Sequence, residues 1–264
     1  MRNNVMDIYG CGHVFNDRHI NFLPKEFDYK IFDLNKKDIV INGKKYLVNN
    51  LDSPKSNLAS IFTPPHIRKN IFKLYNLDLN QIFIEKPVFM NSEDIISFEK
   101  NIGKNVKIFD GYIRNSFNHF NLIKNLIKDQ NIKKISFFEQ KKWSFDSIPI
   151  YLNDFKSNFP IAEVLPHYLS MIFSLSNDVK IVIKEVLDPD IFTSKIIFEV
   201  INCNQIKEIE VIMSMNYQGL SGSILETSEN NYYIPLDSTN KIYLLNNFKL
   251  KIGELENYFY LSNE

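Results

Sequence analysis

The fold of the first part of this chain is decided by the stretch Val5-Met6-Asp7-Ile8-Tyr9-Gly10-Cys11-Gly12-His13-Val14-Phe15. Its apolar beginning predicts a buried strand, and two glycines at the end of a strand are typical of a loop that binds the pyrophosphate of a dinucleotide. The first glycine permits a tight turn, and the second lets the backbone approach a pyrophosphate held at a helix N-terminus. Phe15 stands where a third glycine or alanine is usual, so a plain turn remains an alternative. His13 either contacts the pyrophosphate or caps the following helix, and Val14 lies beside it in the loop.

Short apolar segments alternate with helical segments around this stretch, which is the pattern of parallel βαβ units. The expected strands are residues 5–9, 29–32, 58–62, 82–84 and 106–109. The expected helices are residues 66–75 and 92–101, and Asn91-Ser92-Glu93-Asp94 supplies an N-cap and first-turn acids for the second. Residues 1–112 are therefore expected to form a Rossmann domain with a parallel sheet.

The second part of the chain has longer β-rich segments with polar alternation. The expected strands are residues 132–139, 179–186, 195–201, 208–216, 231–234 and 241–245, and the expected helix is 162–175. Consecutive strands joined by short polar turns predict a largely antiparallel sheet. The predicted fold class is α/β, with the Rossmann domain followed by an α+β domain over residues 113–264 that carries a largely antiparallel open sheet.

Composition and charge restrict the partners. The chain has 264 residues, 44% of them hydrophobic, and its 31 Lys and Arg balance its 31 Asp and Glu. Because no block of like charge stands out, we expect no nucleic acid and no membrane as partners. Cys11 and Cys203 have no Cys or His nearby at zinc-ligand spacing, so we expect no metal site and a reduced, cytoplasmic location. The apolar stretch before Gly10 is too short for a signal peptide or a membrane span.

Asp33 strengthens the dinucleotide interpretation because it closes the second expected strand, about 20 residues after Gly12. A carboxylate there accepts hydrogen bonds from the ribose hydroxyls of the adenosine and disfavours a 2′-phosphate. NAD is therefore the preferred cofactor, although Lys36 and Lys37 leave NADP possible. Two alternatives stay open at this point: Asp33 as a turn residue, and a methyltransferase that uses S-adenosylmethionine.

Two further motifs follow neighbouring strands of the expected sheet. Thr63-Pro64-Pro65-His66 ends the third strand and Glu85-Lys86-Pro87 ends the fourth. Open α/β sheets bind ligands at these carboxyl ends. With these motifs the sequence, from Val5 to about Leu175, resembles the Gfo/Idh/MocA family of NAD(P)-dependent oxidoreductases, which act mainly on sugars, cyclitols and nucleotide sugars.

The resemblance implies that Lys86 is the lysine of the catalytic site. Its ammonium would stabilise the alkoxide that develops as hydride leaves carbon, and Pro87 would help to turn the chain so that Lys86 faces nicotinamide and substrate. The alternative is a surface Glu-Lys-Pro at a strand end. The cofactor-binding residues are then Gly10, Gly12, His13, Val14, Asp33, Thr63, Pro64, His66 and Glu85.

The helix expected in the second domain begins with Glu163-Val164-Leu165-Pro166-His167, since a proline is tolerated in the first helical turn. His167 falls at the family's catalytic histidine, and an imidazole with a pKa near about 6.5 suits the removal of a hydroxyl proton. Glu163, four residues earlier and on the same helix face, would orient or charge-balance His167 where the family commonly has aspartate. The alternative for His167 is a hydrogen-bonded structural histidine.

The segment Gly111-Tyr112-Ile113-Arg114 is similar to the part of the family that crosses into the second domain. Arg114 is either a substrate-binding residue, together with Lys86 and His167, or part of an interdomain salt bridge. His19 and His119 have no nearby companions in the sequence and are interpreted as structural or surface residues.

The resemblance therefore implies an NAD(P)-dependent dehydrogenase or reductase acting on a CH-OH group of a sugar or nucleotide sugar, whose second domain binds substrate and forms a homo-oligomer through its sheet. A second hypothesis is a catalytically silent relative that binds a dinucleotide or a sugar as a sensor or assembly subunit. Phe15, Glu163 in place of aspartate and a short C-terminal half favour that second hypothesis.

Overall fold

A computed structural model describes most of the chain in two compact units, Met1–Gly111 and Tyr112–Glu264, and each unit is described by itself. The boundary lies one residue before the expected one. The described residues are 4–51, 53, 55–75, 79–89, 91–102, 105–142, 161, 163–176, 179–190, 192–201, 206–215, 219–236, 241–245, 251–252 and 255–256. Cys203 and the first residue of the expected helix 162–175 lie outside them.

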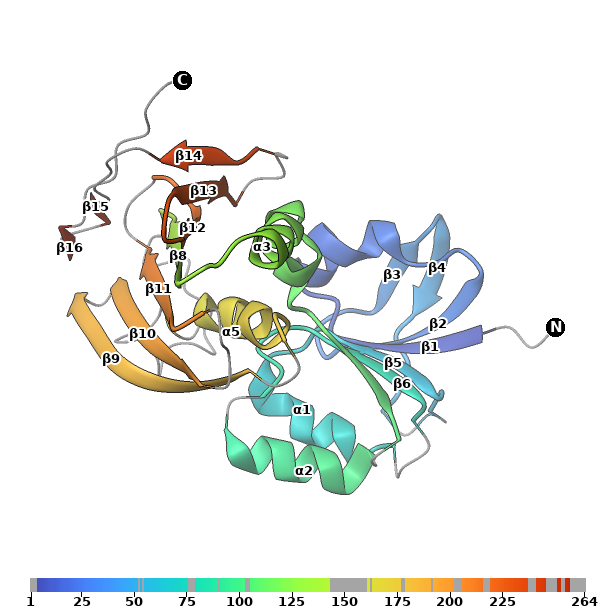
Figure 1. Ribbon diagram of the computed structural model, residues 1–264. Helices are drawn as coiled ribbons and strands as arrows, with labels where there is room; N and C mark the ends of the chain where they lie inside the picture. The colour runs from blue at the N-terminus through green and yellow to red at the C-terminus, as the bar shows by residue number, and fades with distance from the viewer. Residues whose placement is uncertain are drawn as a thin grey trace. The chain divides into compact units, whose positions relative to one another are not determined.

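The first unit contains a five-stranded parallel sheet in the order β2-β1-β5-β6-β7 (Figure 1). Its strands are β1 (Asn4–Tyr9), β2 (Phe27–Phe32), β5 (Leu58–Ile61), β6 (Gln81–Ile84) and β7 (Lys107–Asp110). All five strands were expected from the sequence, with ends that differ by two residues at most. Because β1 has β2 on one side and β5 on the other, the direction of connection reverses at β1, where open α/β sheets bind ligands.

Two helices follow β5 and β6 as expected. They are α1 (Pro65–Phe72) and α2 (Ser92–Ile102), and they pack on each other through Phe72 and Phe98, whose ring centroids are 4.9 Å apart. Asn91 caps α2, since its Oδ1 accepts a hydrogen bond from the Asp94 amide at 3.0 Å. The sequence signals for these helices were therefore sound.

A hairpin that the sequence analysis missed separates β2 from β5. It consists of β3 (Asp38–Ile41) and β4 (Lys44–Leu47), joined at Asn42 and Gly43, both of which have positive φ. Such a turn matches the right-handed twist of paired strands. Just beyond β4, Val48 forms a single parallel bridge with Ile31 of β2. The chain after the hairpin therefore pairs with the sheet at this one residue.

The second unit contains a seven-stranded sheet in the order β14-β13-β12-β8-β11-β10-β9. Only the central pair, β8 and β11, is parallel; the other pairs are antiparallel, as expected for the second part of the chain. The strands are β8 (Lys134–Gln140), β9 (Lys180–Asp190), β10 (Thr193–Ile201), β11 (Glu208–Ser214), β12 (Gly222–Glu226), β13 (Asn231–Pro235) and β14 (Tyr243–Leu245). A short pair, β15 (Lys251–Ile252) and β16 (Leu255–Glu256), forms a separate two-stranded sheet, and β15 contacts β11.

Two helices cover one face of this sheet. They are α3 (Asn118–Asp129), which the sequence analysis missed, and α5 (Leu165–Phe173). Phe120 of α3 and Tyr168 of α5 share one buried cluster with strand residues such as Phe137. The segment Ile113–Ser116 (η3), which opens the unit, packs against both helices.

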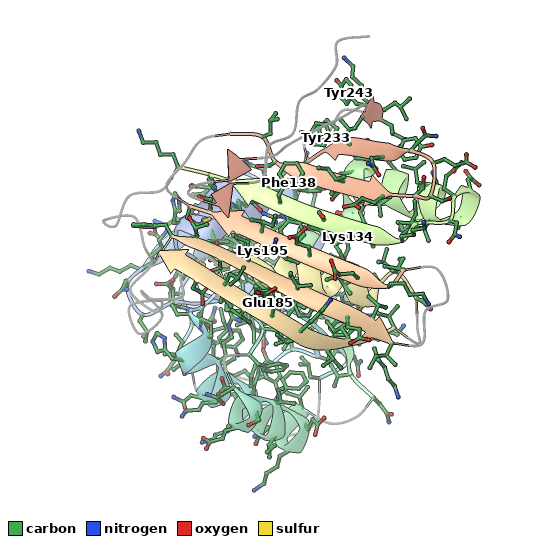
Figure 2. The ribbon with its side chains drawn as sticks, turned by 60° about the vertical axis from the view of Figure 1, so that its left-hand side comes forward. Lys134, Phe138, Glu185, Lys195, Tyr233 and Tyr243 are labelled. Atoms are coloured by element: carbon green, nitrogen blue, oxygen red, sulfur yellow. The ribbon has the colours of Figure 1, made fainter. Side chains whose placement is uncertain are left out.

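The opposite face of the sheet carries both charged and apolar side chains (Figure 2). Lys134 lies 3.1 Å from a carboxylate oxygen of Glu208 and also of Glu210, and Lys195 pairs with Glu210. Next to this network lies an apolar cluster made of Phe138, Ile212, Ile224, Tyr233 and Leu245. We call this surface the outer face.

Two local expectations differ in detail from the structure. A helix follows the glycine turn as expected, but after His13 and Val14 it continues as a π-helical turn, η1 (Phe15–His19), and a 3₁₀ turn, η2 (Ile20–Phe22). In addition, Glu163 is helical as expected, but a turn at Val164 separates it from α5, which begins at Leu165, so Glu163 and His167 do not share one first helical turn.

Candidate active site

The motif residues of the first unit lie at the carboxyl ends of its parallel strands. Gly10 follows β1, Asp33 follows β2, Thr63 comes just after β5, and Glu85 follows β6. Because parallel strands end at the same edge of a sheet, these side chains gather at one edge although they are far apart in the sequence. The edge is the candidate cofactor site.

Gly10 is required at the end of β1 for two reasons. Its φ of +83° is one that other residues rarely adopt, and a Cβ on it would lie 2.8 Å from Cγ2 of Thr63. Its amide donates to the carbonyl oxygen of Phe32 at 2.9 Å, which ties the turn to the end of β2. The turn after β1 is therefore in van der Waals contact with the motif after β5.

Asp33 serves the loop structure directly. Its carboxylate accepts hydrogen bonds from the amides of Cys11 at 2.7 Å, Asn35 at 2.8 Å and Lys36 at 3.1 Å. A carboxylate offers about four acceptor positions, so one remains for a further donor. The turn interpretation of Asp33 therefore holds, and it leaves room for a ribose hydroxyl.

Cys11, between the two glycines, is fully buried. Burial, followed by the nearby Asp33 carboxylate, raises the pKa of its thiol to about 12. Cys11 is consequently a small apolar residue of the loop and remains protonated at neutral pH.

The loop after Gly12 differs from a regular Rossmann helix start. Phe15 is fully buried and packs on Phe62, with ring centroids 5.1 Å apart, where a small residue would let a helix approach the strand closely. His13 is exposed and pairs with Asp17 at 2.7 Å. Gly12 has nothing within 4 Å of a Cβ position, so its backbone faces open space.

Glu85 lies at a junction within the first unit. One carboxylate oxygen is 2.9 Å from Nε2 of His19, and the other accepts a hydrogen bond from the amide of Lys86 at 3.1 Å. A Cβ on Gly111 would lie 2.9 Å from the same oxygen, so the chain at the end of β7 passes close to this carboxylate. His19, interpreted from the sequence as a structural or surface residue, thus links η1 to the Glu85-Lys86-Pro87 motif.

Lys86 is partly buried, and the Lys86–Pro87 peptide bond is cis. Thr63 is buried, and its Oγ1 has no hydrogen-bond partner among the described residues. Pro64 and His66 are exposed at the start of α1. The edge of the sheet therefore combines an ammonium group and a buried hydroxyl with exposed loop residues.

His167 lies in the first turn of α5 and is buried, with 7% of its surface exposed. The ring of Tyr112 stands perpendicular to it, with centroids 5.8 Å apart. The side-chain amide Nδ2 of Asn115 donates to Oγ of Ser170 at 2.7 Å, which ties η3 to α5. Within the second unit, the segment from Tyr112 to Asn115 thus fixes the helix that carries His167.

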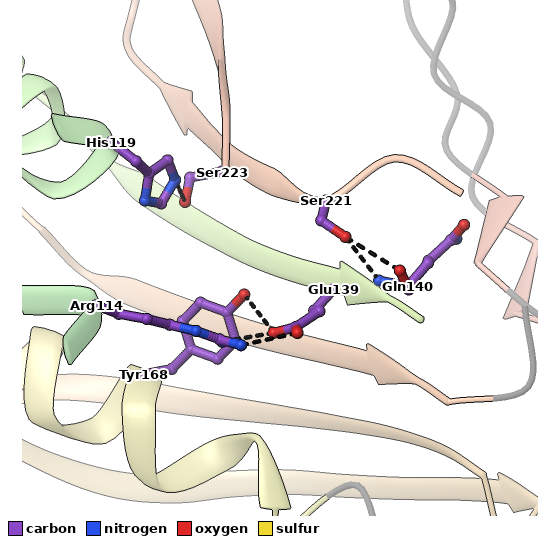
Figure 3. Close-up of polar contacts among 7 residues, drawn as sticks. All are labelled: Arg114, His119, Glu139, Gln140, Tyr168, Ser221 and Ser223. Carbon is purple, nitrogen blue, oxygen red and sulfur yellow. Dashed lines mark hydrogen bonds and ion pairs between the residues drawn. The ribbon is translucent and has the colours of Figure 1, made fainter. Parts of the chain in front are cut away.

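Arg114 forms an ion pair inside the second unit (Figure 3). Its Nη2 donates to Glu139 at 2.7 Å, its guanidinium lies 4.9 Å from the centre of the Tyr168 ring, and the Tyr168 hydroxyl donates to Glu139 at 3.3 Å. Burial alone would lower the pKa of Arg114, but Tyr168 and Glu139 outweigh it and raise the pKa. Glu139 was not anticipated, because only the fold brings β8 to Arg114.

A second polar pair of this unit, also drawn in Figure 3, is fully buried. Nε2 of His119 on α3 lies 2.9 Å from Oγ of Ser223 on β12. Burial, with a contribution from the Arg114 charge, lowers the pKa of His119 to about 4. His119 is therefore neutral at physiological pH and acts as a structural hydrogen-bonding residue, as expected.

The residues of the first unit fit a dinucleotide. Gly12 presents open backbone, Asp33 keeps an acceptor position, and Thr63 holds a buried hydroxyl without a partner among the described residues. No group of three His, Cys, Asp or Glu within the described residues is arranged to hold a metal ion. No helix in the described part of the chain is long and apolar enough to cross a membrane.

Comparisons with known proteins agree at the level of fold. No protein-family model matches the sequence, and no curated protein matches it significantly. Among solved structures, a dehydrogenase from Clostridium difficile is 14% identical with a TM-score of 0.68, over 92% of this chain and 82% of that chain. A D-galactose-1-dehydrogenase from Rhizobium etli is 14% identical with a TM-score of 0.69, over 92% and 82% of the two chains.

A third structure, UDP-N-acetylglucosamine 3-dehydrogenase from Acidithiobacillus ferrooxidans, is 11% identical with a TM-score of 0.64, over 100% of this chain and 85% of that chain. At such identities the similarity establishes the fold alone. The chain therefore shares the fold of these three dehydrogenases, in agreement with the fold that the resemblance of the motifs implied.

Proposed function

We propose that this protein is an NAD(P)-dependent oxidoreductase that transfers a hydride between a nicotinamide cofactor and a hydroxyl or keto carbon of a sugar or nucleotide sugar. One observation carries the proposal: Gly10, Asp33, Thr63 and Glu85-Lys86 all follow parallel strands at one edge of the first sheet. The shared fold with sugar and nucleotide-sugar dehydrogenases supports the substrate class.

In this proposal, the glycine turn and Asp33 bind the adenosine diphosphate part of the cofactor. The carboxylate of Asp33 would accept a ribose hydroxyl and repel a 2′-phosphate, so we expect NAD to bind more tightly than NADP. The bound nicotinamide supplies the hydride acceptor or donor.

The protein's own chemistry in this proposal rests on Lys86 and His167, with Glu163 as a residue that orients or charge-balances His167. The Lys86 ammonium would stabilise negative charge on the reacting oxygen, and His167 would take the hydroxyl proton, or return it in the reverse direction. Arg114 is proposed to influence substrate binding through neighbouring residues, because its guanidinium is hydrogen-bonded to Glu139.

The first test is cofactor binding. NADH, NADPH and S-adenosylmethionine should be titrated against the protein, with nicotinamide fluorescence and melting temperature as readouts. We expect NADH to bind most tightly and to raise the melting temperature by mass action. Stabilisation by S-adenosylmethionine in place of NADH would reject the proposal in favour of a methyltransferase.

The second test is the Lys86→Ala variant, assayed for NAD reduction over a panel of sugars and nucleotide sugars. Loss of the ammonium should lower the rate by about a hundredfold or more while NADH affinity stays within about threefold of wild type. Lys69→Ala, an exposed lysine of α1, is the matched control. Full activity of Lys86→Ala would remove Lys86 from the mechanism.

A catalytically silent dinucleotide-binding relative is the second candidate. It is favoured by Phe15 and the π-helical turn in place of a regular helix, and by Glu163 lying outside α5. Tight NADH binding without hydride transfer to or from any sugar of the panel would select this candidate.

We further propose that the protein is a homo-oligomer that associates through the outer face of the second sheet. The edge strand β9 leaves Val182 (50% exposed) and Leu187 (38%) on this face, beside the charged network of Lys134, Lys195 and Glu210. A surface that combines apolar side chains with both signs of charge can be complementary to itself. We therefore propose a second copy of the same face as the partner.

A further inference from the structure

We propose that Arg68 is a positioning residue of this site, which holds the loop after β5 and the loop that carries Lys86 at a fixed separation. The inference rests on the proposed function for its catalytic meaning. It concerns a residue in the middle of α1 that no sequence motif singled out.

Arg68 is almost completely buried, with 2% of its surface exposed. Its Nε and Nη2 both donate to the carbonyl oxygen of Thr63, at 2.8 and 2.6 Å. On the other side, Nη1 donates to the carbonyl oxygen of Pro87 and, at 3.4 Å, to that of Val88. One guanidinium thus bridges two loops that follow neighbouring strands.

Both loops belong to the proposed site. Thr63 is the residue against which Gly10 packs, so its position sets that of the glycine turn. Pro87 follows Lys86 directly, so a shift of the Pro87 carbonyl moves the backbone that carries the lysine. Arg68 therefore connects the loop after β5 to the loop that carries the proposed catalytic lysine, through its hydrogen bonds to the carbonyl oxygens of Thr63 and Pro87.

The chemistry of the side chain explains why an arginine stands here. A guanidinium is planar and presents its donors in a fixed fork, so it can bond two carbonyls in set directions at once. A lysine would keep the charge but offers one flexible donor group, which cannot hold both loops in the same geometry. Burying a charged side chain costs free energy that an apolar side chain of similar size would not cost. The hydrogen bonds to the two loops therefore explain the arginine better than space filling does.

The test compares Arg68→Lys and Arg68→Ala with Lys69→Ala, an exposed neighbour on the same helix. Circular dichroism selects a temperature at which each variant is folded, and Arg68→Lys serves if Arg68→Ala does not fold. The readouts are NADH affinity, the emission spectrum of the bound nicotinamide, and hydrogen exchange of the amides in 62–63 and 86–89.

Both Arg68 variants should lower NADH affinity by about tenfold or more, shift the bound nicotinamide emission and speed amide exchange in both loops. Millimolar guanidinium should restore affinity to Arg68→Ala and leave Arg68→Lys unchanged. Lys69→Ala should match wild type within about twofold.

A folded Arg68 variant with wild-type NADH affinity, emission and loop exchange would overturn the proposal and leave Arg68 a purely structural residue. If the wild-type protein binds neither NADH nor NADPH, the proposed function fails, and the positioning role of Arg68 is then judged on hydrogen exchange alone. Unchanged exchange in both loops would reject it in that case as well.

Discussion

At the residue scale, Gly10 and Gly12 illustrate how two glycines of one motif meet different surroundings. An alanine at Gly10 would need a positive φ and would place its Cβ 2.8 Å from Thr63 Cγ2, whereas an alanine at Gly12 would meet nothing within 4 Å. We therefore expect Gly10→Ala to lower the free energy of unfolding by about 1–3 kcal/mol. Gly12→Ala should change it by about 0.5 kcal/mol or less and still weaken NADH binding by about tenfold.

Urea unfolding and NADH titration of the two variants separate these effects. A Gly10→Ala variant as stable as wild type would contradict the steric argument. A Gly12→Ala variant with unchanged NADH affinity would show that its open backbone is not where a pyrophosphate approaches.

His119 predicts a pH dependence of stability. Its pKa is lowered to about 4 in the folded protein, against about 6.5 when unfolded. Because the unfolded state binds the proton more readily, the stability contributed by neutral His119 is complete above about pH 6.5 and is lost as the pH falls toward 4. The loss between pH 7 and pH 4.5 should be about 2 kcal/mol.

The measurement is urea unfolding of wild type and His119→Gln at both pH values. Glutamine can still bond Ser223 but does not titrate, so the drop in stability with falling pH should be smaller by that amount in the variant. Equal drops in the two proteins would mean that His119 is not the titrating group.

Residues of the site differ in how far the sequence could predict them. Gly10, Asp33 and Lys86 belong to local motifs, because a tight turn or a strand end requires particular residues within a few positions. The contacts of His19 with Glu85, and of Arg114 with Glu139, join residues far apart in the chain. Only the tertiary fold creates such pairs, so no spacing in the sequence indicates them.

At the element scale, strands with a clear apolar pattern were predicted, and elements with a weaker signal were missed. The hairpin β3–β4 had a usable signal, since Asn42-Gly43 stands between alternating residues such as Ile39 and Ile41. Helix α3 also had one, because Phe120 and Ile123 repeat at helical spacing and both are buried. The π-helical turn had none, because it depends on how Phe15 packs against the sheet.

The hairpin turn gives a clean prediction about backbone strain. Gly43 has a φ of +78°, and a Cβ there would meet nothing within 4 Å. The only cost of an alanine is therefore the strain of a positive φ. Gly43→Ala should lower the free energy of unfolding by about 1–2 kcal/mol. Gly43→Asn should cost less, because asparagine tolerates positive φ; equal losses in thermal unfolding would contradict this explanation.

At the scale of the whole molecule, the sequence predicted a parallel sheet followed by a largely antiparallel one. It did so because the hydrophobic pattern changes from continuous apolar strands to alternating ones. The pattern could not indicate whether the outer face meets water or another copy of the protein. The same alternation of polar and apolar residues is compatible with both. Val182 and Leu187 can be identified as exposed residues of this face only when the structure places β9 at the edge of the sheet.

That edge allows the proposed oligomer to be tested on one strand. Val182 pairs with Glu199 and lies on the outer face, whereas its neighbour Ile183 pairs with Phe198 and lies on the face that α3 and α5 cover; the two are 50% and 60% exposed. A lysine at Val182 would bring a charge into an interface on the outer face, where an unpaired charge is costly, while a lysine at Ile183 would remain outside it. Light scattering after size exclusion should therefore show a lower mass for Val182→Lys and the wild-type mass for Ile183→Lys. A wild-type protein that is monomeric at tens of micromolar would reject the proposed oligomer, and equal masses for the two variants would place the interface elsewhere than on the outer face.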